Sequence, residues 1–287
     1  MNDANSFARK DSGKPDVSPP HFDYEKSIWG AGEADMKWTS PARFRLREAL
    51  KSIRNLPSGS RILETGCGAG QFIRAIKKMR PDLDCHGCDI SSAAISAARR
   101  KPGVSYVLCR AEELPYAENF FDAVLIFDVL EHVENPRAVL GDIRRVLKTN
   151  GIFYCFAPCE GDYLSIWHLL DKFGRKKDIT KKYAGHINFF SRRSLKELCL
   201  SAGFGIARIA YSEHFLGQIA GVAAFRMMDK EARKRGVGQM NNEEFFSARG
   251  GKGAGILKRI GNFAINLESA IFRALPSPNV HLIMTKK

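Results

Sequence analysis

The sequence has no uninterrupted apolar stretch as long as the roughly 18 residues that a membrane-spanning helix requires. Residues 1–5 also lack the basic and then apolar pattern of a secretion signal. The seven cysteines are an odd number without the spacing of a disulfide framework, which favours a reducing cytoplasm. Cys85 and Cys88 form a CxxC motif, but no second pair follows at the spacing of a zinc site. We therefore expect no metal site.

Acidic residues are fewer than basic ones: the sequence has 31 Asp and Glu and 45 Lys and Arg, which gives a formal net charge of +14. This excess favours an anionic partner, such as membrane headgroups, nucleic acid or an acidic substrate, although solubility alone would also explain it. The hydrophobic content of 44% is ordinary for a globular protein. A length of 287 residues suits one α/β domain with additions.

Two glycine-rich phosphate-binding patterns are also missing. The Walker Gly-Lys-Ser/Thr sequence is absent, and the sixth position of a dinucleotide fingerprint counted from Gly66 is Gln71. Instead, a strand-like run at 61–65 leads into glycines at alternate positions within 66–70, and residues 71–79 have the apolar spacing of a helix. Open α/β sheets bind ligands at such a loop, where glycine lets the ligand approach the backbone.

Glu64 stands at the mouth of this loop, where its carboxylate would repel a phosphate and attract a cation. S-adenosylmethionine has a sulfonium and an ammonium group and no phosphate. The segment 64–70, Glu-Thr-Gly-Cys-Gly-Ala-Gly, closely resembles motif I of the class I S-adenosylmethionine-dependent methyltransferases. The resemblance implies that S-adenosylmethionine is the cofactor and that this motif supplies the following binding residues: Glu64, Gly66, Cys67, Gly68 and Gly70.

Further cofactor contacts are expected at the ends of the next strands. The predicted second strand, 83–90, ends in Asp89 followed by Ile90. An acid at this place bonds ribose hydroxyls in nucleoside-binding α/β folds, because one carboxylate can accept from both. In segment 110–116 the resemblance places Ala111 and Glu112 at the adenine ring.

The apolar run 121–127 predicts a central parallel strand. The resemblance implies that Asp128 and Val129, which follow it, hold the methionine end of the cofactor. His132 is a candidate proton acceptor, since an imidazole is partly neutral near pH 7, or alternatively a structural histidine of the loop. Methyl transfer depends chiefly on alignment, but a hydroxyl acceptor also needs a base, and His132 and His186 are our candidates.

The resemblance covers about residues 60–211 and fits the subset that includes ubiquinone O-methyltransferases. It implies a Rossmann-like, seven-stranded, mostly parallel sheet with helices on both faces and an antiparallel last strand. The alternation of strand and helix patterns predicts an α/β fold independently. We expect a disordered leader at 1–22, an aromatic and helical lid at 23–57 and the methyltransferase domain at 58–287. The lid would cover the cofactor or simply the edge of the core.

Insertions at 159–190 and 212–278 interrupt this domain and are expected to form a cap. Within the second, residues 215–228 predict a helix and 229–255 a mobile loop. Residues 256–275 predict a helix with one apolar stripe that either packs on the domain, lies on a membrane or covers a lipid-like substrate. The stripe comprises Ile256, Ile260, Phe263, Leu267, Ile271 and Ala274.

We expect methyl transfer from S-adenosylmethionine to a small or lipid-like acceptor, at oxygen, by a cytoplasmic enzyme peripheral at an anionic membrane surface. The alternatives are a non-catalytic S-adenosylmethionine-binding protein and a methyltransferase acting on RNA or protein. Methylation of nucleic-acid amino groups is disfavoured, because segment 128–131 lacks the Asn/Asp-Pro-Pro-aromatic motif of those enzymes. The glycine spacing and Glu64 disfavour a nicotinamide oxidoreductase. The sequence indicates neither the acceptor nor an oligomeric state.

Overall fold

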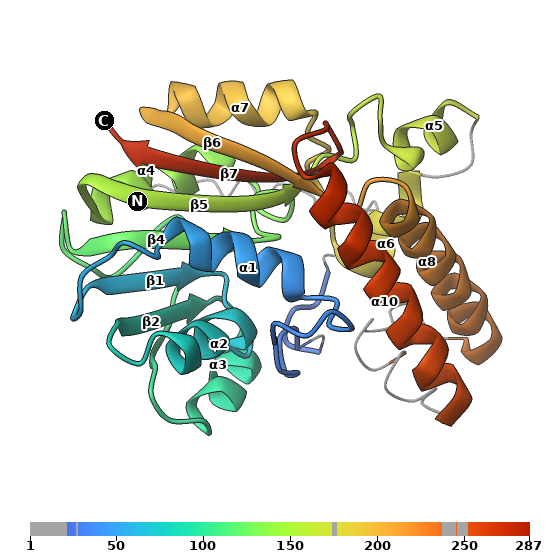
Figure 1. The fold of residues 1–287 in the computed structure, drawn as a ribbon, viewed down its shortest axis with the longest axis horizontal. Helices are drawn as coiled ribbons and strands as arrows, with labels where there is room; N and C mark the ends of the chain where they lie inside the picture. Colours follow the sequence, from blue (N-terminus) through green and yellow to red (C-terminus); the bar gives the residue numbers. More distant parts are fainter. Residues whose placement is uncertain (1–21, 27, 174–176, 237–244, 246–251) are drawn as a thin grey trace, which may run out of the picture.

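A single sheet of seven strands organises the computed structural model, which describes residues 22–26, 28–173, 177–236, 245 and 252–287. The strand order is β3-β2-β1-β4-β5-β7-β6, and β7 runs antiparallel to both of its neighbours. This arrangement confirms the predicted fold class (Figure 1). The strands are β1 (Arg61–Thr65), β2 (Asp84–Asp89), β3 (Ser105–Leu108), β4 (Phe121–Phe127), β5 (Leu147–Pro158), β6 (Phe204–Ser212) and β7 (Asn279–Lys286).

Helices cover both faces of the sheet. On one face α1 (Arg43–Ser52), α2 (Gln71–Met79) and α3 (Ser92–Arg99) share a core with the strands, and on the other face α4 (Pro136–Val146) and α7 (Arg192–Ser201) do so. Along β4 the side chains alternate between the faces: Val124 and Ile126 face α4 and α7, whereas Ala123 and Leu125 face α1 and α2. Burial on both faces explains why this strand is continuously apolar.

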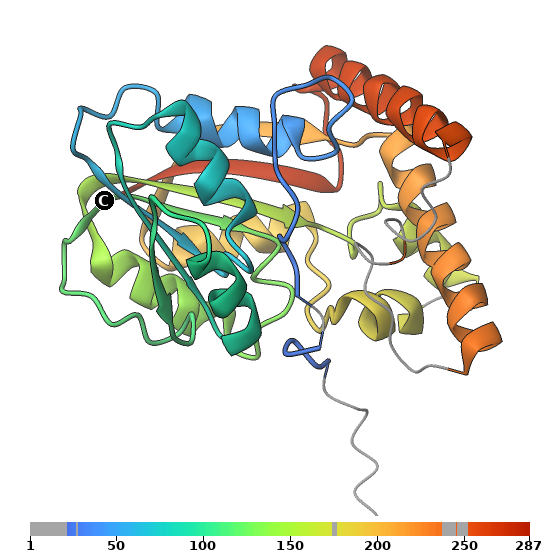
Figure 2. The same ribbon diagram turned by 90° about the horizontal axis from the view of Figure 1, so that it is seen from below.

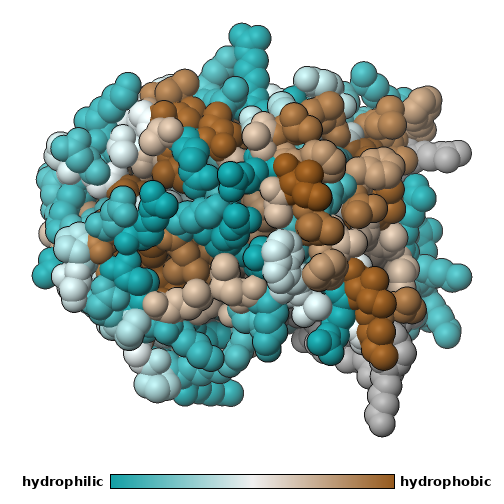
Figure 3. Space-filling view, in the orientation of Figure 1, coloured by the Kyte–Doolittle hydropathy of each residue, from teal (hydrophilic) through white to brown (hydrophobic). Residues whose placement is uncertain are grey.

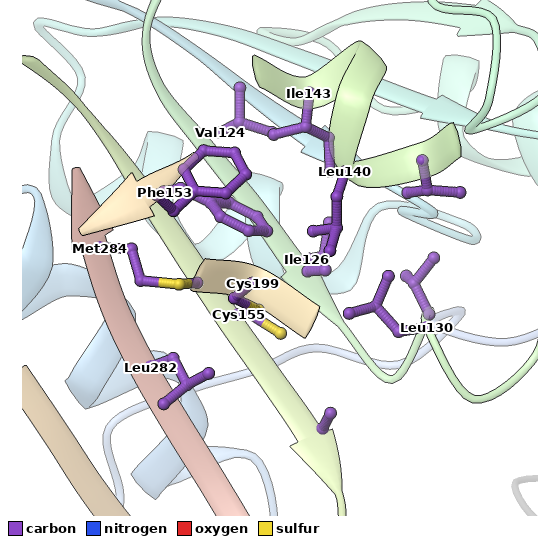
Figure 4. Packing of buried hydrophobic residues seen from close by; sticks show 14 of the residues in the cluster. Val124, Ile126, Leu130, Leu140, Ile143, Phe153, Cys155, Cys199, Leu282 and Met284 are labelled. Atoms are coloured by element: carbon purple, nitrogen blue, oxygen red, sulfur yellow. The ribbon is translucent and has the colours of Figure 1, made fainter. Parts of the chain in front are cut away.

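The core on the side of α4 and α7 is closely packed (Figure 4). It joins side chains from β4, β5, β7 and both helices, and all of those labelled in the figure are inaccessible to solvent. Capping residues start several helices: Ser91 Oγ accepts from the N–H of Ala94 at α3, and Asn135 accepts from Ala138 at α4. The packed core and the capped helices hold the sheet in place, so its carboxyl edge can carry a site.

Among the described residues, four more helices form a cap beside the carboxyl edge of the sheet (Figures 1 and 2). They are α5 (Ile166–Lys172), α6 (Lys177–Ala184), α8 (Leu216–Arg235) and α10 (Lys252–Phe272). In Figure 2 the dark-blue segment before α1, here called the lid segment (described residues 22–42), runs between sheet and cap. None of the described helices is both long and apolar enough to cross a bilayer.

Some sequence-based boundaries were wrong. The loop predicted at 229–255 is helical at both ends. Helix α8 continues to Arg235 and stops at Gly236, whose φ is 66°, and α10 already begins at Lys252. The remainder of that loop lies outside the described residues apart from Phe245, as does the leader predicted at 1–22 apart from Phe22. Strand β5 begins at Leu147, directly after α4, and its Leu147 pairs with Phe121 of β4.

Helix α10 packs with its polar side inward. Asn266 Nδ2 donates to the carbonyls of Trp38 and Ser40 at 2.7 and 2.8 Å, and Asn262 Nδ2 donates to the carbonyl of Thr39 at 3.0 Å. The predicted apolar stripe faces solvent, with exposed fractions from 42% to 64% for Ile256, Ile260, Phe263, Leu267 and Ile271. Figure 3 shows these brown side chains over α10. The alternative of a stripe packed on the domain was therefore wrong.

Candidate active site

The glycine loop connects β1 to α2 in a conformation that requires glycine. The φ angles of Gly66, Gly68 and Gly70 are 70°, 53° and 81°, in the left-handed region that other residues avoid. A Cβ at Gly68 would also collide with the carbonyl oxygen of Trp29, which accepts from the N–H of Ala69 at 2.7 Å. The lid segment thus crosses the loop at its centre.

Glu64 lies beneath the start of α2 and not in the open mouth of the loop. Its side chain is 2% exposed, and Oε2 accepts from the N–H of Ile73 at 2.7 Å. Burial raises the pKa of Glu64 to about 8, although the hydrogen bond opposes the shift. This carboxyl group braces the loop and the helix, and its direct contact with a cofactor stays a prediction.

Asp89 ends β2 beside the same loop. Its Oδ2 accepts from the N–H of Gly68 at 2.7 Å, and its Oδ1 accepts from the N–H of Ser91 at 2.9 Å. The side chain of Ile90, 50% exposed, borders a pocket of about 390 Å³ next to Asp89. The lining of this pocket comes from the lid segment and the start of α3: Phe22, Asp23, Tyr24, Glu25, Ile90 and Ser91.

The other predicted cofactor residues lie in neighbouring loops. Ala111 and Glu112 follow β3, whose Leu108 pairs with Asp89, and Glu112 is half-buried with an ion pair of 3.5 Å to Arg110. Cys67 is buried within the glycine loop, and its N–H donates to the carbonyl of Cys88 at 2.9 Å. The residues therefore surround one end of the sheet, as the sequence predicted, while their binding roles stay predictions.

The turn after β4 is held in an unusual backbone conformation. Asp128 has a φ of 52°, which is rare for a residue with a side chain. Arg45 of α1 donates from Nη1 to Asp128 Oδ2 at 2.8 Å and lies 3.4 Å from Glu213. Val129 packs against Gly66, where a Cβ would strike its side chain. Sequence reasoning missed Arg45, because nothing in the pattern of α1 distinguishes it from a solvent-exposed arginine.

His132 and His186, the two predicted base candidates, lie side by side. Their ring centroids are 4.9 Å apart, in an edge-to-face arrangement. Burial and then His186 lower the pKa of His132 to about 3, so this imidazole is neutral at pH 7 and a weak base. Burial and then Asp128 raise the pKa of Glu131 well above its usual value. The ring centroid of Tyr24, from the lid segment, lies 6.1 Å from that of His132, in an edge-to-face arrangement.

Two residues that the sequence did not single out position this pair. Asn188 Nδ2 donates to the carbonyls of Leu130 and Val133 at 3.0 and 2.7 Å, so it ties the segment carrying His186 to the turn carrying His132. Glu160 Oε1 lies 3.2 Å from His186 Nδ1. These contacts join segments far apart in the chain, and only the folded structure reveals them.

Comparison with known proteins settles the family. Residues 39–208 match the family model described as a methyltransferase domain. The chain belongs to this methyltransferase family. Membership confirms the predicted class of enzyme and its methyl donor, S-adenosylmethionine, as well as the resemblance stated above.

Three relatives show how far the likeness extends. An uncharacterized protein of Methanocaldococcus jannaschii is 31% identical over 55% of this chain and 69% of its own length. A tRNA (carboxymethyluridine(34)-5-O)-methyltransferase of Arabidopsis thaliana is 33% identical over 47% of the chain and 29% of its own length. A ubiquinone biosynthesis O-methyltransferase of Parvibaculum lavamentivorans is 31% identical over 33% of the chain and 38% of its own length. Matches to the two named enzymes therefore span less than half of each.

A solved structure supports the fold. The 4+2 cyclase SpnF superposes with a TM-score of 0.57 at 18% identity, covering 91% of this chain and 86% of its own. Residues at the carboxyl edge also fit S-adenosylmethionine. The loop turns through glycines that pack directly against Val129, Trp29 and Tyr106, so its backbone reaches the carboxyl edge of the sheet. Asp89 lies beside the pocket, and Ile90 offers an exposed apolar surface for a base.

Proposed function

We propose that the protein transfers the methyl group of S-adenosylmethionine to an oxygen of a small or lipid-like acceptor at the carboxyl edge of the sheet. The observation that carries this proposal is the turn after β4. Asp128 and Val129, the expected contacts of the methionine end, are separated by Leu130 alone from Glu131 and His132, which meet His186 there. Cofactor and acceptor groups would therefore lie on one short, rigid segment.

The chain's own residues would act mainly by alignment and by excluding water. When bound, S-adenosylmethionine supplies a methyl carbon that its sulfonium makes electrophilic. Holding an acceptor oxygen in line with that carbon accounts for much of the rate in such displacements. Tyr24 and Phe22 of the lid segment cover the histidine pair, since Tyr24 contacts His132 and Phe22 packs at Gly185. Neutral His132 has a lone pair that can accept a hydrogen bond from the acceptor hydroxyl.

Exposed apolar side chains on the cap and in the segment directly after His186 favour a hydrophobic acceptor. Leu164, Leu169 and Phe173, in and around α5, are 39%, 53% and 72% exposed. Ile187 and Phe189, which follow His186, are 42% and 40% exposed. Exposed apolar groups of this size next to a polar site commonly mark a binding surface for an apolar ligand.

The helical cap also suits an anionic membrane surface. Its exposed stripe on α10 adjoins exposed basic residues, and α8 exposes Ile219 and Met227 beside Arg226 and Lys230. An apolar face flanked by basic residues is typical of helices that lie in the lipid interface. Each basic residue near anionic lipid contributes about 1 kcal/mol, and salt weakens this attraction.

Transfer of a labelled methyl group tests the proposed reaction. The full chain would be incubated with S-adenosylmethionine carrying an isotopic methyl label, together with lipid extract, RNA and protein from cells. We expect the label in the organic extract, on an ether oxygen, and no label with Gly68→Val. Label in RNA or protein would overturn the proposal in favour of those acceptors, and binding of S-adenosylmethionine without any labelled product would indicate a non-catalytic protein.

Co-sedimentation with vesicles tests the membrane surface. The protein should sediment with vesicles of anionic lipid at low salt, less so at about 1 M salt, where the screening length is about 3 Å. Ile260→Glu, on the stripe, should weaken this binding. Leu200→Glu is the matched control, because Leu200 is 49% exposed on α7, away from the cap. Equal sedimentation of both variants, or none of the wild type at low salt, would contradict the proposal.

A further inference from the structure

Three side chains converge below the lid segment. Glu131 and His132 come from the turn after β4, and His186 follows α6. One carboxylate oxygen of Glu131 and one ring nitrogen of each histidine all lie within 4.8 Å of one another. Glu131 Oε1 is 3.8 Å from His132 Nε2. Glutamate oxygen and imidazole nitrogen are the ligands that bind zinc and similar cations in proteins.

The carboxylate of Glu131 lacks a partner that its burial would demand. The residue is 0% exposed, and neither carboxylate oxygen has a hydrogen-bond partner among the residues that the structure describes. Buried carboxyl groups are nearly always hydrogen-bonded, paired or bound to a metal, because desolvation is costly. Arg45 pairs with Asp128 and Glu213. A cation held between Glu131 and the two histidines would supply the partner that this carboxylate lacks.

One ring nitrogen of each histidine is already engaged. His132 Nδ1 lies 3.3 Å from the carbonyl of Gly185, and His186 Nδ1 lies 3.2 Å from Glu160 Oε1. Thr180 Oγ1 in turn donates to Glu160 Oε2 at 2.9 Å. A proton on each Nδ1 leaves the Nε2 lone pair free. Metal-binding histidines characteristically donate their other N–H to a carboxylate or a carbonyl in this way.

We propose that Glu131, His132 and His186 bind one divalent transition-metal cation of the zinc class, with a coordination position left for another ligand. Three protein ligands and one open position are the arrangement of catalytic rather than structural zinc sites. This inference differs from our sequence-based expectation of no metal, because residues 131, 132 and 186 show no ligand spacing along the chain.

The role of the cation in catalysis rests on the proposed methyl transfer. The open position would take the acceptor oxygen, and a bound cation lowers the pKa of a coordinated hydroxyl. The hydroxyl proton would pass to solvent, and the oxygen lone pair would form the new bond to the methyl carbon as the carbon–sulfur bond breaks, its electrons remaining on sulfur. With a cation bound, the lone pair of His132 would bind the metal in place of the acceptor hydroxyl, so the weak basicity of His132 would not limit the reaction.

Calorimetric titration of chelator-stripped full-length protein with Zn²⁺ alone tests the site. We expect one equivalent to bind, with affinity reduced roughly tenfold or more by Glu131→Gln or His186→Ala, and about 10–100-fold by Glu160→Gln. His214→Ala and Glu197→Gln, which change a histidine and a glutamate outside the cluster, should bind like the wild type. Retained binding of S-adenosylmethionine by Glu131→Gln would establish that this variant is folded; if it is not, Glu160→Gln and His186→Ala decide the matter.

Co²⁺ gives a second readout, because its absorption spectrum reports the ligand atoms. Bands without a thiolate charge-transfer component are expected for nitrogen and oxygen ligands. A thiolate band would place the metal on cysteines and would overturn the inference. So would Zn²⁺ binding that is unchanged in Glu131→Gln, His186→Ala and Glu160→Gln, or the absence of Zn²⁺ binding by folded wild-type protein. Zn²⁺ binding without labelled methyl transfer would refute the proposed function alone; methyl transfer by protein that binds no Zn²⁺ would refute the metal site alone.

Discussion

Helices α2 and α10 are both amphipathic, yet they turn opposite sides to the protein. α2 buries Phe72, Ile73 and Ile76 against the sheet. α10 exposes its apolar stripe and directs Asn262 and Asn266 toward backbone carbonyls of the lid segment. The difference arises from what each helix meets: apolar strands in one case and backbone carbonyl groups of the lid segment in the other. Helical periodicity therefore predicts an element but not the side on which it packs.

The two regions are consequently stabilised in different ways. The sheet region depends on two large apolar clusters, one on each face. The described part of the cap has a small cluster of Tyr183, Met228, Ala232 and Phe245, and it is joined to the lid segment by side-chain hydrogen bonds. We infer that the sheet region carries the stability of the fold and that the cap is free to present its apolar surface.

The largest effect should follow from a cavity in the sheet region. Phe153 of β5 is inaccessible to solvent, and Phe153→Ala should lower the free energy of unfolding by about 3–5 kcal/mol. Urea denaturation followed by circular dichroism would measure the change. A loss below about 1 kcal/mol would mean that the sheet is not the stabilising region.

A buried acid of the same region should make stability depend on pH. The pKa of Glu64 is raised from 4.5 to about 8 by burial, so its stabilising contribution is complete below about pH 4.5 and is lost as the pH rises toward 8. Glu64→Gln removes this titration, and its unfolding free energy should fall less than that of the wild type between about pH 5 and about pH 8. One pKa unit corresponds to about 1.4 kcal/mol, so we expect a difference above about 1 kcal/mol.

The matched control for this experiment is Glu197→Gln, since the Glu197 side chain is 61% exposed on α7. It should follow the wild type across the same pH range. An unchanged pH slope in Glu64→Gln would show that Glu64 titrates near its ordinary pKa in the folded protein.

A smaller and local effect is expected where α10 meets the lid segment. Asn266→Ala removes the side-chain donor from the carbonyls of Trp38 and Ser40, and Ser40 keeps the N–H of Arg43 at 3.3 Å, so the change should cost about 1–3 kcal/mol of local stability. Hydrogen exchange at the amides of α10 should speed up, while exchange in β4 stays slow. Asn262→Ala, which removes one bond, should have the smaller effect. Equal exchange in all three proteins would mean that these bonds do not hold the helix.

The smallest effect is expected on the exposed stripe. Phe263 is 44% exposed, and Phe263→Ala should change the free energy of unfolding by no more than about 0.5 kcal/mol. Urea denaturation of this variant and of Phe153→Ala would compare directly what an exposed and a buried phenylalanine contribute to the free energy of unfolding. A cost of several kcal/mol would show that the stripe is buried in solution, against a second copy or another part of the chain.

Local sequence patterns predicted the sheet because each strand and helix carries its own periodicity. The run 121–127 and the glycine loop at 66–70 are examples, and both appear where expected. The buried position of Glu64 was not predictable, since a motif gives an order of residues and not which group lies under a helix. Arg45 and Glu160 were missed for a related reason: their partners, Asp128 and His186, come close only through the fold.

Calorimetric titration with S-adenosylmethionine and NAD most directly tests whether the sheet region alone binds the cofactor. The wild type and the cap variant Ile260→Glu should bind S-adenosylmethionine with equal affinity and should not bind NAD. Gly68→Val should not bind, because its side chain would collide with the carbonyl of Trp29 and its φ of 53° disfavours valine. Tight binding of NAD in place of S-adenosylmethionine, or undiminished binding by folded Gly68→Val, would contradict this division of the molecule.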